Sequence, residues 1–244
     1  MRYAVISDIH ANMEALQAVL ADAAPRSPDG YLCLGDVVGY GPDPNACVER
    51  VRRLGGAVIA GNHDRGAVGQ LAAAAFSPLA RAAIEWTAQE LTEDNRAYLA
   101  ALPERCDTPA FVAVHGSPRR PVEEYILDLP TALAVFAEAD FRVCLAGHTH
   151  VAGVFARHPN GHLRTEALPP EAPFDLAAAS RYIINPGSVG QPRDGDPRAA
   201  YLVFDDARLQ AVLHRVAYPI AATQAKMARR GLPTLLSRRL AAGV

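Results

Sequence analysis

The hydrophobic positions of the chain form short, nearly unbroken runs with little polar alternation. Seven runs have the length of a β-strand, and they are "YAVIS", "YLCLG", "AVIAG", "FVAVHG", "VCLAG", "YIINPG" and "AAYLVFD". Runs of this kind are typical of strands that are buried on both faces of a sheet. The pattern therefore predicts sheets that are covered on both sides.

Segments with helical spacing and helix-start signals lie between these runs. The expected helices run from the Asn12 cap to about Ala23, from Asp43-Pro44 onward, from Ser77-Pro78 onward, from the Thr92 cap to about Leu102, and over about 131–139. Alternation of strands and helices predicts parallel strand pairing, at least in the first half of the chain.

The pattern changes after residue 150. A β-hairpin is predicted around Asn160-Gly161, further strands are expected up to about Tyr218, and two short helices should follow in 219–244. The chain contains no internal repeat and no long low-complexity linker. We therefore interpret residues 1–244 as a single α/β domain, with two β-sheets packed as a sandwich flanked by helices and 219–244 as a C-terminal helical extension packed on it.

Composition narrows the function classes. The 244 residues are 50% hydrophobic and 20% charged, with a formal net charge of −2, which is typical of a globular protein without a dominant nucleic-acid-binding surface. Arginine suits phosphate recognition, but its abundance here is explained as simply by genome composition. No apolar run approaches the roughly 20 residues that a membrane span needs.

Cysteine usage bears on the compartment. The four cysteines show no C-x-x-C spacing, and two of them lie inside apolar strand-like runs, so a disulfide framework is not expected. The first residues, "MRYAVISDIH", lack the charged-then-apolar pattern of a signal peptide. A cytoplasmic location is therefore expected.

Five short polar clusters follow apolar runs, and they are "SDIHAN", "GDVVGYG", "GNHDR", "HGS" and "GHTH". The carboxyl ends of parallel strands converge at one edge of a sheet, so these clusters are expected to meet. His148 and His150 are two residues apart, and in an extended segment both rings can face one point. Aspartate and histidine suit divalent metal ions. Each cluster alone could be an ordinary turn, but the five together predict a metal site.

The order D-x-H, GD, GNHD, HG, GHTH resembles the calcineurin-like metallophosphoesterase superfamily. In metallo-β-lactamase-type hydrolases, by contrast, the paired-histidine motif comes first. The chain is most similar to the compact bacterial and archaeal phosphodiesterase-like subgroup, through the segments "GDVVGYGPDPNACVERV", "HGSPRRPVEEYI", "NPGSVGQPRDGDPRAAY" and "GLPTLLSRRLAAG". The resemblance implies a four-layer αββα fold, which agrees with the pattern of runs.

The resemblance also implies roles for individual residues. A first metal ion would be bound by Asp8, His10, Asp36 and His150, and a second by Asp36 as a bridge with Asn62, His115 and His148. The catalytic residues would be His63, which would contact the substrate, and Asp64, which would orient the His63 ring. The cofactors would be two divalent metal ions. Manganese, iron, zinc and nickel all suit these ligands. Manganese is the ion that we expect to support activity.

The implied activity is hydrolysis of phosphate esters by metal-activated hydroxide. We expect a phosphodiesterase that acts on a small-molecule phosphate ester or nucleotide. The alternatives are a phosphomonoesterase, a nucleotide pyrophosphohydrolase, and a non-catalytic protein-binding scaffold of the same fold. Nucleic acid and membrane partners are not expected, and a homo-oligomer is left open.

Substrate-binding residues are harder to choose, because loop packing explains most candidates equally well. We select Arg119 and Tyr40, and the other candidates near the motifs are Arg120, Tyr125, Gln191 and Arg193.

Overall fold

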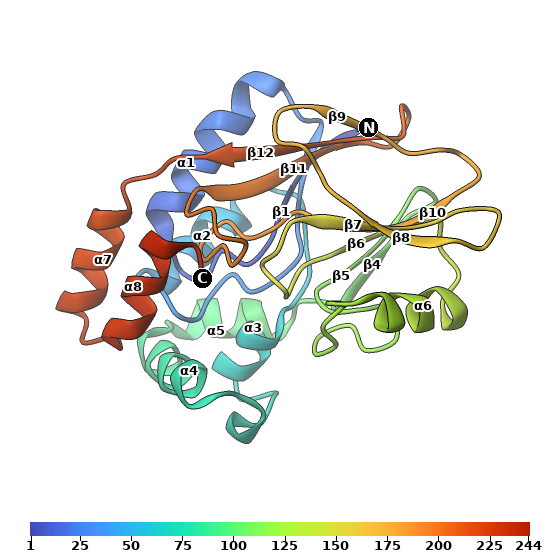
Figure 1. Ribbon diagram of the computed structural model, residues 1–244. Helices are drawn as coiled ribbons and strands as arrows, with labels where there is room; N and C mark the ends of the chain where they lie inside the picture. Colours follow the sequence, from blue (N-terminus) through green and yellow to red (C-terminus); the bar gives the residue numbers. More distant parts are fainter.

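The first of two six-stranded sheets contains the N-terminal strand at its centre (Figure 1). The structure, a computed structural model, describes all residues from 1 to 244. The strand order of this sheet is β3 (Ala57–Val58), β2 (Gly30–Cys33), β1 (Arg2–Ile6), β11 (Ala199–Asp205), β12 (Gln210–Val216) and β9 (Pro173–Asp175). Strands β1, β2 and β3 pair in parallel, as the alternating pattern predicted, whereas β11 returns antiparallel to β1.

The second sheet repeats this mixture of pairings. Its order is β4 (Arg105–Asp107), β5 (Val112–Val114), β6 (Val143–Ala146), β10 (Arg181–Asn185), β7 (Gly153–Arg157) and β8 (Leu163–Glu166). Strands β5, β6 and β10 pair in parallel, and β7–β8 is the hairpin predicted around Asn160-Gly161.

Three apolar layers hold the sheets and helices together. Side chains of both sheets meet in one buried cluster, for example Val5 of β1 with Leu145 of β6. Helices α1 (Met13–Ala23) and α2 (Pro44–Arg52) cover the outer face of the first sheet, and α6 (Leu129–Glu138) covers that of the second. The predicted α/β sandwich flanked by helices is therefore confirmed, because strands that are apolar on both faces need cover on both.

The remaining helices surround one end of the sandwich. They are α3 (Asn62–Ala67), α4 (Pro78–Glu90), α5 (Glu93–Ala100) and the short 3₁₀ turn Ala73–Ala75. A second 3₁₀ turn, Ala24–Arg26, directly follows α1 near the start of β1, where Nη1 of Arg2 donates to the carbonyl of Arg26 at 3.0 Å. The side chains of Asn12, Ser77 and Thr92 accept N-cap hydrogen bonds as expected. Helix α3 was not predicted, because six residues are too few to show a helical period.

The C-terminal segment forms a helical hairpin of α7 (Ile220–Arg229) and α8 (Thr234–Ala242). Met227, Leu236 and Leu240 pack against α4 and the loop after β2, and Lys226 bridges Glu14 and Asp43 at 2.6 and 2.7 Å. The interpretation of 1–244 as a single domain stays a prediction. None of the helices combines the length and the apolar character that crossing a membrane requires.

Candidate metal centre and substrate pocket

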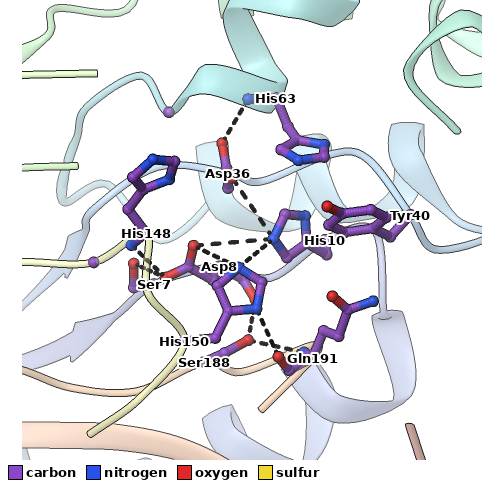
Figure 2. Close-up of polar contacts among 12 residues, drawn as sticks. Ser7, Asp8, His10, Asp36, Tyr40, His63, His148, His150, Ser188 and Gln191 are labelled. Atoms are coloured by element: carbon purple, nitrogen blue, oxygen red, sulfur yellow. Dashed lines mark hydrogen bonds and ion pairs between the residues drawn. The ribbon is translucent and has the colours of Figure 1, made fainter. Parts of the chain in front are cut away.

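The five polar clusters meet at one end of the two sheets, each just after a strand. Figure 2 shows residues of the SDIHAN, GDVVGYG, GNHDR and GHTH clusters side by side. They follow β1, β2, β3, β5 and β6, all of which pair in parallel with a neighbour. Seven side chains from these clusters, here called the ligand cluster, have exposures between 0% and 8%. They are Asp8, His10, Asp36, Asn62, His115, His148 and His150.

The backbone of these loops is unusual. Ten non-glycine residues of the chain have positive φ, and seven of them lie in the clusters, namely Asp8, His10, Ala11, Asp36, Tyr40, His148 and His150. Left-handed backbone at a non-glycine residue costs roughly 1–2 kcal/mol and persists only where its surroundings enforce it. Such strain concentrated in one place is typical of a functional site, where it aims side chains that a relaxed loop would direct elsewhere.

Two glycines allow the backbone to approach the ligand carboxylates. A Cβ on Gly61 would lie 2.0 Å from Oδ1 of Asp36, and a Cβ on Gly147 would lie 2.1 Å from Oγ of Ser7 and 2.9 Å from Oδ2 of Asp8. Any side chain at either position would push a carboxylate out of the cluster. The glycines of GNHD and GHTH are therefore required by the close packing of the site.

Each carboxylate has one oxygen bound by the protein and one without a partner. Oδ2 of Asp8 accepts from Oγ of Ser7 at 2.6 Å and from the His148 backbone N–H at 3.2 Å, and Oδ1 of Asp36 accepts from the His63 backbone N–H at 2.8 Å. Oδ1 of Asp8 and Oδ2 of Asp36 are buried without a hydrogen-bond donor. Both orphaned oxygens face the cluster, where a buried anionic oxygen requires a cation.

The four imidazoles are fixed in the same way. One ring nitrogen of each lies near a backbone carbonyl oxygen, at 3.2 Å for His10, 2.9 Å for His115, 3.2 Å for His148 and 2.6 Å for His150. A carbonyl only accepts, so that nitrogen carries the proton and the other nitrogen presents a lone pair. Such carbonyl contacts orient histidines that bind metals.

The inward nitrogens come very close to one another. Nε2 of His10 lies 3.0 Å from Nε2 of His150, and Nε2 of His115 lies 3.0 Å from Nδ1 of His148. Two lone pairs at this distance repel unless a cation or a proton lies between them. A divalent cation is the species that can accept the lone pairs of these facing nitrogens and also neutralise the unpartnered carboxylate oxygens.

The charges within the cluster act on its pKa values. Burial alone would raise the pKa values of Asp8 and Asp36, but the imidazoles, His150 for Asp8 and His115 for Asp36, lower both below the usual range. Burial lowers the pKa of His148 to about 3, whereas Asp36 overcomes burial at His115 and raises its pKa to about 9. A proton on His115 is thus what a metal ion would have to displace.

The ligand atoms fall into two groups with one shared member. Asp8, His10, Asp36 and His150 have ligand atoms within 4.8 Å of one another, as do Asp36, His115 and His148. Oδ2 of Asp36 lies 3.6 Å from Nε2 of His10 and 3.4 Å from Nε2 of His115, between the groups. Oδ1 of Asn62 is 3.1 Å from Nε2 of His115 and adds a neutral oxygen to the second group. The residues present therefore fit two adjacent divalent ions.

His63 lies beside the ligand cluster, with its ring 4.8 Å from that of His10. Its Nδ1 is buried without a partner, and burial lowers its pKa to about 4 although the Asp36 carboxylate opposes the shift. The predicted contact between Asp64 and this ring is wrong. The Asp64 carboxylate instead accepts from the backbone N–H groups of Gly61 at 3.0 Å and Val38 at 3.1 Å, so it fixes the loops rather than the imidazole.

A pocket of about 340 Å³ opens over His63, His148 and Asn62. Six of its other side chains form what we call the pocket wall, and they are Tyr40, Leu71, Phe76, Tyr125, Arg193 and Arg239. The Tyr125 ring stacks on His148 with 3.6 Å between the ring centroids, and Tyr40 lies 4.4 Å from His63. The pocket therefore provides aromatic surface on both sides of the ligand cluster.

Comparison with known proteins places this arrangement in a family. Residues 1–207 match the calcineurin-like phosphoesterase superfamily domain. The chain belongs to this superfamily. The chain is also 38% identical over 246 residues to an uncharacterized protein of Methanocaldococcus jannaschii, with 98% of this chain and 97% of that protein covered.

Two solved structures resemble this phosphoesterase-superfamily protein over its whole length. A metallophosphoesterase from Sphaerobacter thermophilus is 44% identical with a TM-score of 0.89, and the match covers 100% of this chain and 99% of that chain. A hypothetical protein from Pyrococcus horikoshii shares the fold at 22% identity, with a TM-score of 0.79 and coverage of 100% and 98%. The compact bacterial and archaeal type predicted from the sequence is confirmed.

The structure revises the predicted substrate contacts of this superfamily member. Tyr40 lines the pocket, as predicted, but Arg119 does not. The Arg119 guanidinium is held by Glu124 and, at 2.7 Å, by Glu138, so its charge is already neutralised outside the pocket. Arg193, one of the other candidates, lines the pocket in its place. Arg239 was missed altogether, because nothing in the sequence connects α8 with motifs almost 100 residues away.

Proposed function

We propose that this superfamily member is a phosphodiesterase that depends on two divalent cations. Asp8, His10, Asp36 and His150 would bind the first cation. Asp36 would bridge to a second, which Asn62, His115 and His148 would complete. The observation that supports this proposal is the shared position of Asp36, whose unpartnered Oδ2 lies between two sets of inward-facing nitrogens.

The chemistry follows from these donors. When bound, two divalent cations supply the Lewis acidity that activates water at neutral pH and neutralises the phosphoryl charge. The protein holds its carboxylates and imidazoles rigid, so little reorganisation is needed as charge develops. His63 would bind a phosphoryl oxygen as a neutral N–H donor, since burial keeps its pKa low. The negative charge of a bound phosphodiester beside the ring would raise that pKa and allow proton transfer to the leaving group.

The pocket favours an organic group on each side of the scissile phosphate. Tyr40 with Phe76 lines one part of it and Tyr125 another, which gives room beyond the phosphoryl group itself. A phosphomonoesterase or nucleotide pyrophosphohydrolase would use the same centre, and these activities remain the alternatives. A protein-binding scaffold would not need the ligand set and the adjacent histidine together, and both are present.

Metal identity and location complete the proposal. The mixture of carboxylate, amide and imidazole donors suits manganese, iron, zinc or nickel, and manganese is the ion that we propose for activity. All four cysteines are unpaired, and three of them are buried. Free thiols agree with a reducing compartment, so we propose a cytoplasmic enzyme.

The proposal is tested with bis(4-nitrophenyl) phosphate, 4-nitrophenyl phosphate and a nucleoside diphosphate. Each is assayed after exhaustive chelation and after addition of Mn²⁺, Fe²⁺, Zn²⁺ or Ni²⁺. We expect hydrolysis to vanish on chelation and to return most strongly with Mn²⁺, with the diester preferred. Full activity in protein shown by elemental analysis to be metal-free would overturn the two-cation proposal. A preference for the monoester or the diphosphate would select one of the alternatives.

A further inference from the structure

Two arginines of the pocket wall have no acidic partner. No ion pair involves Arg193 or Arg239, whereas other half-buried arginines, such as Arg65, Arg119 and Arg215, pair with carboxylates. Nη2 of Arg193 donates to Oε1 of Gln191 at 2.9 Å and to the Tyr40 hydroxyl at 3.4 Å, while its buried Nε has no partner. The pocket therefore contains positive charge that the protein does not neutralise.

The two arginines lie on elements that are attached to each other. The backbone N–H of Gly195, two residues after Arg193, donates to the carbonyl of Gly243 at the end of α8 at 3.0 Å. Gly243 has φ +68°, and a Cβ there would lie 2.8 Å from the backbone of Asp196. The end of α8 is thus docked on the loop that carries Arg193, and this contact fixes Arg239 relative to Arg193.

The rest of α8 is anchored as well. Leu236 and Leu240 are buried with Phe76 and Tyr40, which line the same pocket. Helix α8 lies outside the segment that matches the superfamily domain, which ends at residue 207. The C-terminal hairpin therefore brings a charged group to the pocket from outside the segment that matches the superfamily domain.

One aromatic ring separates Arg193 from the ligand cluster. The guanidinium carbon of Arg193 lies 5.8 Å from the centroid of the Tyr40 ring, which in turn lies 4.4 Å from the His63 ring and 4.6 Å from the His10 ring. The pocket thus carries the charge of Arg193 one ring away from the ligand cluster, and Arg239 lines the same pocket.

We propose that Arg193 and Arg239 bind a second phosphoryl group of the substrate. Preferred substrates would then carry two phosphoryl groups on a short linker, one at the ligand cluster and one at the arginines. The inference rests on the proposed function for the scissile group only. Guanidinium groups match the geometry of phosphate oxygens and keep their charge at any physiological pH. Glu123, the one acidic residue that lines the pocket, lies 3.6 Å from Arg120.

Equilibrium binding tests the subsite without requiring turnover. Propane-1,3-diyl bisphosphate, propyl phosphate and 3-(phosphonooxy)propanoate are titrated calorimetrically into Mn²⁺-loaded and chelated protein. We expect the bisphosphate to bind the loaded protein roughly ten- to a hundredfold more tightly than propyl phosphate, which is the usual range for a charge-assisted contact. Equal binding of the carboxylate compound and the bisphosphate would overturn the phosphoryl assignment.

Variants assign the effect to the two arginines. Arg239→Gln and Arg193→Gln should each remove most of the preference for the bisphosphate over the monophosphate. Arg238→Gln is the matched control, because Arg238 is exposed on the same helix and does not line the pocket, and it should keep the full preference. An unchanged preference in Arg239→Gln, with the helix content and melting temperature of the parent protein, would overturn the proposal.

The two proposals fail in different ways. If Mn²⁺-dependent hydrolysis of nitrophenyl esters is present but the bisphosphate preference is absent, the arginine subsite is wrong and the proposed function stands. If the preference is present and depends on Arg239, but no phosphate ester is hydrolysed, the subsite stands and the proposed function is wrong.

Discussion

The ligand cluster and the pocket wall adjoin each other, yet they are built in opposite ways. Ligand-cluster side chains are at most 8% exposed, and nearly every polar atom is either fixed by a backbone group or faces its neighbours. The two arginines of the pocket wall are only half-buried and have few partners. The difference teaches that the ligand cluster is rigid and tolerates little substitution, whereas side chains of the pocket wall can be replaced with less effect on their neighbours.

The origin of the side chains reinforces this contrast. Ligand-cluster residues come from short loops, each directly after a strand of the shared core. Pocket-wall residues come from the loop after β2, the α3–α4 region, two long loops and the C-terminal hairpin. A change in the cluster therefore disturbs the centre of the fold, while a change in the wall leaves the sheets untouched.

The largest effect is expected for Asp36→Asn. The amide keeps the shape but removes the negative charge that both proposed sites share, so both ions should be lost together. We expect a fall in activity of at least about a thousandfold, since several kcal/mol of charge stabilisation depend on the metals. Metal content by elemental analysis and turnover of a nitrophenyl ester measure the two effects.

His150→Ala is the comparison for that variant. His150 belongs to only one of the two ligand groups, so this change should deplete mainly one ion. Two ions bound at parental affinity in Asp36→Asn would contradict the bridging role. The ligand cluster would then be less sensitive to substitution than its contrast with the pocket wall implies.

His63→Ala should affect turnover without affecting the metals. Its ring contacts none of the unpartnered carboxylate oxygens, so metal content should stay at the parental level. Loss of a positioned proton donor typically costs about 10²–10⁴-fold, mainly in kcat. The loss should be greater for alkyl esters than for nitrophenyl esters, because nitrophenolate leaves without protonation. Equal losses for both esters would assign His63 to binding of the phosphoryl oxygens, and loss of an ion would make it a ligand.

Asp64→Ala should act mainly on stability. The change leaves the buried N–H groups of Gly61 and Val38 without acceptors, and each unsatisfied donor costs about 1–3 kcal/mol. Urea denaturation should show a free energy of unfolding that is lower by roughly 2–4 kcal/mol. Asp94→Ala, at an exposed position in the first turn of α5, is the control and should change little. Parental stability in Asp64→Ala would show that these hydrogen bonds contribute nothing.

Arg119→Gln should have the smallest effect. The guanidinium pairs with Glu124 and Glu138 near the surface, and exposed pairs contribute about 0–1 kcal/mol. We expect kcat/KM to stay within about twofold of the parental value, since the side chain does not line the pocket. A large rise in KM would restore Arg119 as a substrate contact and move the boundary of the pocket wall.

The sequence was sufficient to predict the layers and the meeting of the five polar clusters, for a physical reason, whereas the individual ligand assignments came from the resemblance to the superfamily. Each candidate ligand follows a buried strand within a few residues, and parallel strands must converge at their carboxyl ends. Local order was enough to place Asp8, Asp36 and His115 at the same edge of the sheets. Contacts from other loops then fix the side chains, namely the His148 and His63 backbone N–H groups at the two carboxylates and the Leu34 carbonyl at the His115 ring.

The remaining features depend on contacts that no local pattern contains. The Asp64 carboxylate turns towards two backbone N–H groups because Gly61 and Val38 approach it from different loops. Arg119 is drawn away from the pocket by Glu124 and Glu138. Arg239 reaches the pocket only because α8 docks on the loop at Gly195. Long-range packing decides all three, so their roles had to be read from the structure.

Because of the left-handed backbone at the ligand residues, the stability of the folded protein should depend on how much metal is available to it. The strained loops and the facing lone pairs lower the stability of the metal-free chain. Ions that bind only the folded form stabilise it by mass action, by about 4 kcal/mol when the free ion concentration is a thousand times Kd. A cell short of the metal would therefore lose folded protein as well as activity. The abundance of this protein would then follow the metal content of its surroundings, without any dedicated sensor.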